Sequence, residues 1–142
     1  VCSSDLMALI VPDAGELELL TKLLINTNDT ENYLLRLYKN SYSPSGSTVI
    51  GDFTEADFTT YAEKTLARGD WASPSTVANK AESSVTAQSW TCGASGNTVY
   101  GYYVVGATSG VCLWAEEFAS PRILANGDIL NLTPKFNLSS AN

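Results

Sequence analysis

The chain has 142 residues, which is enough for one domain with a real hydrophobic core. It carries 8 Lys+Arg against 15 Asp+Glu and has no long apolar run, so we expect no binding to nucleic acid and no membrane insertion. It has no histidine, and therefore lacks the usual general base of Ser and Cys nucleophiles and the commonest transition-metal ligand.

The first six residues, VCSSDL, resemble a translated sequencing adapter, and Met7 is the only methionine. We therefore predict that residues 1–6 are a non-native scar and that residues 7–142 form a single domain. The alternative is a processed N-terminus at Val1.

An apolar, β-prone arm follows, made of Ala8, Leu9, Ile10 and Val11 and cut off by Pro12. A free terminal strand can add to a sheet edge in its own subunit or in the next one. We interpret the arm as a subunit contact, and both placements stay open.

A helix is predicted over about 13–26. Four leucines fall on one helical face, and acidic residues stand near the N-terminal end, where the helix dipole favours them. The leucines are Leu17, Leu20, Leu23 and Leu24.

The rest of the chain is rich in short β-prone runs separated by turn-like segments. The segment 40–51, rich in Ser, Pro and Gly, is predicted to be an exposed loop. The pattern predicts a mainly β fold, an antiparallel β-sandwich or jelly roll with one N-terminal helix. The predicted strands are 33–39, 59–66, 75–80, 84–92, 99–105, 111–118 and 129–138.

Two cysteines lie within these strands, Cys92 and Cys112. If the last strands form a meander, Cys92 stands opposite about Thr98 and Cys112 opposite about Val105. The thiols are then offset by about 23 Å, well beyond the ~7 Å Cα separation that a disulfide tolerates. We predict two free, buried thiols.

Acidic residues are the only candidates for catalysis, because glycoside hydrolysis needs just two carboxylates. Glu116 and Glu117 are adjacent on a strand and so point to opposite faces. Asp52, Glu55 and Asp57 cluster at a turn and are best explained as caps, with a calcium site as the alternative. We expect no catalytic residue, no metal and no cofactor, and keep a hydrolase only as the third hypothesis.

Aromatic side chains provide a second candidate site. Trp71, Tyr100 and Tyr102 are candidates for stacking on sugar rings, with Tyr100 and Tyr102 predicted on one strand face. Trp90 and Trp114 are predicted to fill the core.

Three tripeptides match the acceptor pattern for N-glycosylation. They begin at Asn28, Asn131 and Asn137, and they matter only in a cell that glycosylates the protein.

Five distinctive stretches cover much of the chain: MALIVPDAGE, LRLYKN, FTEADFTTYAEKTL, SWTCGASGNTVYGYYVVGA and ANGDILNLTPKF. In these, from about residue 7 to 141, the sequence resembles small, mostly uncharacterised structural proteins of tailed bacteriophages. The resemblance implies a virion protein of β-sandwich type and supplies no active-site residue.

Together these features predict a non-enzymatic structural subunit in a virion or outside the cell. It would assemble with copies of itself or with other virion proteins, as capsid decoration, tail, fibre or helical filament. The alternative is a carbohydrate-binding module that attaches to glycans.

Overall fold

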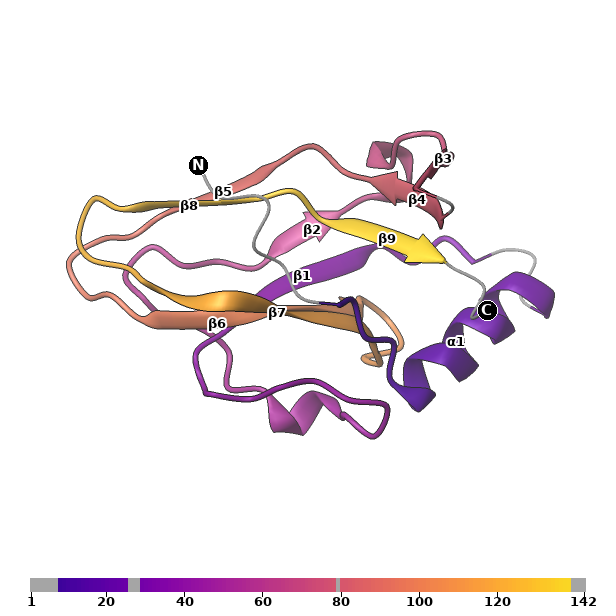
Figure 1. Cartoon of the computed structure of the whole chain (residues 1–142), viewed down its shortest axis with the longest axis horizontal. Helices are drawn as coiled ribbons and strands as arrows, with labels where there is room; N and C mark the ends of the chain where they lie inside the picture. Colours follow the sequence, from indigo (N-terminus) through magenta and orange to yellow (C-terminus); the bar gives the residue numbers. More distant parts are fainter. Residues whose placement is uncertain (1–7, 26–28, 79, 139–142) are drawn as a thin grey trace.

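The computed structural model describes residues 8–25, 29–78 and 80–138. The predicted scar, residues 1–6, and Asn28 lie outside the described residues. The fold is mainly β, with antiparallel sheets and one N-terminal helix among the described residues, as the sequence predicts (Figure 1).

The first layer is a four-stranded antiparallel sheet in the order β2-β1-β6-β7. Its members are β1 (Tyr33–Tyr38), β2 (Lys64–Leu66), β6 (Thr98–Gly106) and β7 (Cys112–Ile123). The long β6–β7 hairpin dominates this layer, with Val105 opposite Cys112. The predicted strand 59–66 is reduced to its last three residues, because Thr59 and Thr60 form a turn in which Thr60 has a φ of 76°.

The second layer combines a three-stranded sheet, β3-β4-β9, with a two-stranded sheet, β5-β8. The bounds are β3 (Ser75–Val77), β4 (Lys80–Ser84), β5 (Gln88–Thr91), β8 (Ile129–Leu132) and β9 (Lys135–Leu138). β4 is followed by β5 and β8 by β9, so the same two chain segments form both sheets. Between the two sheets, the Val85 N–H bonds to the Pro134 carbonyl at 3.0 Å. Pro134 cannot donate to a ladder, which helps explain why the predicted strand 129–138 is broken there.

The core lies between the layers. Side chains from the first layer, such as Leu35, Leu37 and Trp114, meet Trp90 and Leu130 from the second. Tyr33, Leu35 and Leu37 contact this core while Tyr38 lies in a second cluster, so the side chains of β1 alternate between the two faces of the sheet.

The segment 40–51, predicted to be an exposed loop, covers the outer face of the first layer. With the following residues and a 3-10 turn at Ile50–Asp52 it buries a second cluster of apolar side chains. Phe53 stacks on Tyr103 with ring centroids 4.4 Å apart, and Thr48 is almost fully buried. The prediction of an exposed loop is confirmed for most of 40–51, in which only Thr48 is buried. Tyr42 and the following residue Phe53 anchor the loop on the sheet face.

Cys92 and Cys112 are free and buried, as predicted. The predicted pairing was right for Cys112, which faces Val105, but wrong for Cys92, since β5 pairs with β8 in the other layer. Burial raises the pKa of the Cys112 thiol to about 12. Its sulfur therefore behaves as a small apolar group.

The helix α1 (Asp13–Leu24) lies at one end of the molecule (Figure 1). Within the described ranges, no helix combines the length and apolar character needed to cross a bilayer.

Candidate functional site

The helix α1 is held to the body of the protein by a narrow face. Gly15, Leu19 and Lys22 are spaced four and three residues apart and therefore share that face. Gly15 lies directly against the backbone of β7: a Cβ added there would come within 2.5 Å of the Leu113 carbonyl oxygen. The absent side chain allows this close approach.

A cluster of charges fixes the same face further along. The Lys22 ammonium bonds to Asp29 at 2.9 Å and to Glu31, and lies 3.3 Å from Glu18. Burial disfavours the charge of Lys22, but these carboxylates hold its pKa above the usual value. Glu31 also accepts hydrogen bonds from the backbone N–H groups of Thr108 and Ser109, which links the helix to the β6–β7 turn.

The opposite side of α1 is apolar and exposed. Leu23, for example, retains 78 % of its accessible surface. We name these residues, with the exposed Leu138 at the end of β9, the head patch: Leu17, Leu20, Leu23, Leu24 and Leu138. The sequence identified the leucines as one helical face, but it contained no signal that this face points away from the core.

Beside the head patch runs a groove of about 420 Å³ between α1 and β9. Among the described residues that line it, Glu16 is the one that carries a charge. The apolar lining is Val11, Leu19, Leu20, Leu23, Phe136 and Leu138. The groove can therefore accept apolar side chains from outside the chain.

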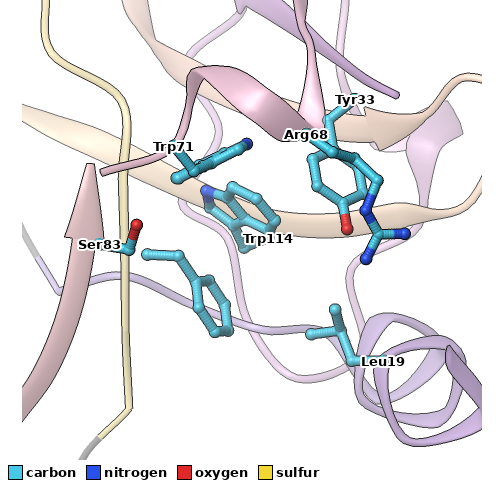
Figure 2. Close-up of a pocket in the computed structure, with 7 residues that line it drawn as sticks. Leu19, Tyr33, Arg68, Trp71, Ser83 and Trp114 are labelled. Atoms are coloured by element: carbon cyan, nitrogen blue, oxygen red, sulfur yellow. The ribbon is translucent and has the colours of Figure 1, made fainter. Parts of the chain in front are cut away.

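A second cavity, of about 290 Å³, lies on the other side of Leu19 and Phe136 (Figure 2). Four aromatic rings gather here: Trp71 and Trp114 meet edge to face at 5.9 Å, and Tyr33 and Phe136 each lie beside Trp114. We name this cavity the aromatic pocket; its other lining residues are Arg68 and Ser83.

Among the described residues, no hydrogen-bond acceptor lies within reach of the buried indole N–H groups of Trp71 and Trp114. In Figure 2 the nitrogen of Trp114 lies close to the Trp71 ring, consistent with their edge-to-face contact. A buried donor without a partner costs about 1–3 kcal/mol, which the packing of the surrounding rings must offset.

A third apolar feature lies at the far end of β7. Ile123 and Ile129 are 79 % and 60 % exposed, and both line a cavity of about 430 Å³ around the β7–β8 connection. We name this pair the tail patch. Sequence reasoning missed it, because Ile129 begins a run that is typical of an ordinary strand and Ile123 lies between two predicted strands.

The predicted arm pairs with its own chain. Ile10 forms a bridge to Ala115 on the edge of β7 through two hydrogen bonds of 2.9 Å. Leu9 and Val11 pack against the core, while Ala8 is exposed. Val11 also lines the groove, so the arm reaches the candidate contact surface.

The three candidate sugar-stacking residues do not form one row. Tyr102 is fully buried in the core, Tyr100 packs against the cluster on the other sheet face, and half-buried Trp71 lines the aromatic pocket. The prediction that Tyr100 and Tyr102 share a face was wrong, because the register of β6 shifts between Val99 and Gly101. Such an irregularity breaks the alternation on which the prediction relied.

The turn acids are held by separate partners. Asp52 accepts from the Val49 N–H, Glu55 from the Tyr61 hydroxyl, and Asp57 pairs with Lys39. Across the described ranges no group of three or more His, Cys, Asp or Glu side chains is placed to hold a metal ion.

The two adjacent glutamates take different environments. Glu116 is buried in the interior and accepts a hydrogen bond from the Tyr102 hydroxyl at 2.7 Å, whereas Glu117 is only half-buried. Burial raises the pKa of Glu116, and Glu82 adds to the effect while Lys135 opposes it.

Two glycosylation tripeptides begin in described strands. Asn131 is exposed on β8 and Asn137 is half-buried on β9.

In comparisons with known proteins, no family model, no curated protein and no solved structure matches the chain.

Proposed function

We propose that the protein is a non-enzymatic structural subunit that assembles with copies of itself through the head patch. The observation that carries this proposal is the outward-facing row of leucines on α1. Exposed apolar residues that lie singly are ordinary on a monomer, but a contiguous patch of large side chains marks a contact surface.

The way α1 is attached supports a contact role. Its inner face is secured by Gly15 and by the Lys22 charge cluster, so the leucines are held in one fixed orientation. A rigid apolar face loses little conformational freedom on binding, which favours association. The groove beside it offers a concave surface into which a second molecule can insert.

The chemistry of the chain is consistent with this role. It has no histidine, and the turn acids are each engaged in local contacts. In line with the resemblance to phage structural proteins, we propose that the assembly belongs to a bacteriophage virion or an extracellular filament. The arm takes part through Val11, which lines the groove.

The test is the oligomeric state of the full chain. We expect wild-type protein to form larger particles as its concentration rises, in sedimentation velocity and negative-stain electron microscopy. The double variant Leu20→Glu/Leu23→Glu should stay monomeric with an unchanged far-UV spectrum, because both positions are exposed. The loss should be at least about tenfold in the association constant, since two charges would be buried at the contact.

Val49→Glu is the matched control. Val49 is 55 % exposed, close to the 53 % of Leu20, but lies outside the head patch. The Val49→Glu variant should assemble like the wild type. A wild-type chain that stays monomeric at every concentration, or a head variant that still assembles normally, would overturn the proposal.

The aromatic pocket supports a second candidate function, binding of a single sugar ring. The aromatic rings that line it suit the apolar faces of a sugar. Titration with a panel of monosaccharides should change the tryptophan fluorescence, and Trp71→Ala should abolish the change. No response across the panel would remove this candidate.

A further inference from the structure

We propose that the copies join head to tail: the head patch and groove of one subunit receive the tail patch of the next. This inference rests on the proposed self-assembly and adds its polarity and its second surface. The occupant of the groove is then the β7–β8 corner of another copy, with Ile123 and Ile129 as the inserted side chains.

The two patches lie at opposite ends of one strand. Gly15 of α1 packs against Cys112 and Leu113, where β7 begins, and Ile123 is its last residue. At about 3.3 Å per residue, ten residues of strand separate the patches by roughly 30 Å. Figure 1 shows α1 at one end of the long axis and the β7–β8 connection at the other. A single subunit therefore cannot cover its own head with its own tail.

Both surfaces are apolar where they are exposed. The groove of the head lies between α1 and β9, and all its described lining residues except Glu16 are apolar. Ile123 and Ile129 stand at the corner between β7 and β8, where they line a cavity of about 430 Å³ and keep most of their side chains exposed. Contact between these isoleucines and the groove would bury apolar area on both partners.

Charge disfavours the symmetric alternative, in which two heads pair. The exposed acids Asp13 and Glu16 lie on α1, and Glu16 lines the groove. Two heads face to face would bring these like charges together. The tail carries one charge of each sign, Arg122 and Asp128, and so imposes no such repulsion. Head-to-head pairing would also leave Ile123 and Ile129 exposed.

Head-to-tail contacts are heterologous, so they continue from subunit to subunit. They close into a ring when the rotation between neighbours permits it and otherwise give an open filament. The inference thus predicts rings or filaments, whereas head-to-head pairing stops at a dimer.

Complementation between two variants of the full chain tests the polarity. The head variant is Leu20→Glu/Leu23→Glu and the tail variant is Ile123→Glu/Ile129→Glu. Each keeps one intact surface, so neither should assemble alone. Mixed in equal amounts they should form a one-to-one heterodimer that grows no further, seen as a single new species in sedimentation velocity.

The outcomes separate the two proposals. A monomeric wild type overturns self-assembly itself. If the wild type and the tail variant both assemble normally, only the head-to-tail inference is overturned. Dimers of the tail variant alone would assign the contact to paired heads.

Site-specific cross-linking gives a second measurement that does not depend on disruptive charges. In a Cys2→Ser background, Leu23→Cys and Ile123→Cys chains should form a mixed disulfide when combined. The two native cysteines of the described fold are buried and give little background. Cross-linking of Leu23→Cys to itself, with none to Ile123→Cys, would contradict the inference.

Discussion

At the scale of single residues, Glu116 shows how context decides what an acid does. Its neighbour Glu117 is only half-buried, but Glu116 points into the core and has Tyr102 as its hydrogen-bond partner. Burial disfavours the ionised form, so the folded-state pKa of Glu116 is raised above its ordinary value. For an acid, a raised pKa means stability that is present at low pH and is lost as the pH rises through the folded pKa.

Glu116→Gln should therefore stabilise the protein at pH 7, because glutamine can still accept the Tyr102 hydrogen bond and carries no charge. We expect a gain on the order of 1 kcal/mol, because a buried polar group that is incompletely satisfied costs roughly 1–3 kcal/mol and more when it is charged. The gain should vanish near pH 4. Urea unfolding at the two pH values measures it, with Glu117→Gln as control. An equal gain at both pH values would show that ionisation is not its cause.

At the scale of the elements, α1 is an unusual amphipathic helix. The side that faces the protein is formed by Gly15, Leu19 and the charged Lys22, and most of the leucines face outward. Its attachment relies on Lys22 with Asp29 and Glu31, whose side chains are nearly buried. The hydrogen bond from Lys22 holds the pKa of Asp29 below its ordinary value. Burial would raise the pKa of Glu31, but hydrogen bonds from Lys22 and from the backbone N–H groups of Ser109 and Thr108 lower it.

Lys22→Met should destabilise the fold by about 3 kcal/mol at pH 7, because it leaves the nearly buried Glu31 carboxylate without its cation, while Asp29 keeps Arg68 at 3.1 Å. Depressed carboxylate pKa values contribute stability above the unfolded-state values of about 4. That contribution is lost as the pH falls below them. The difference between wild type and variant should therefore shrink at pH 3 in urea unfolding.

Lys39→Met is the matched control for this prediction. It removes the partner of Asp57, whose side chain is 66 % exposed, and exposed ion pairs contribute less than about 1 kcal/mol. Equal losses in the two variants would show that the Lys22 cluster has no special role in holding α1.

At the scale of the whole molecule, the protein is an elongated sandwich with different apolar surfaces at its two ends. The net charge of −7 opposes random aggregation of such a molecule. Association then requires a contact that buries enough apolar surface to overcome this repulsion. The pairing of head with tail provides such a contact and makes an assembly directional.

The sequence by itself determined the fold class, the N-terminal helix and the free thiols. These follow from local pattern: alternation in β1, regular turns, leucines at helical spacing, and cysteines on distant strands. Several strand positions in the second half of the chain also follow from such patterns. The sequence missed the break at Pro134, the turn that separates β3 from β4 within 75–80, and the extension of β7 beyond 118 to Ile123.

The tertiary structure alone decided which faces these elements present. The sequence placed four leucines on one face of α1, yet it is the contact of Gly15 with β7 and the ion pairs of Lys22 that turn that face outward. The same holds for Tyr100 and Tyr102, separated by a register shift, and for the gathering of Trp71, Trp114 and Phe136 into one pocket. Local periodicity fixes which residues share a face, but the direction of that face depends on contacts between residues far apart in the chain.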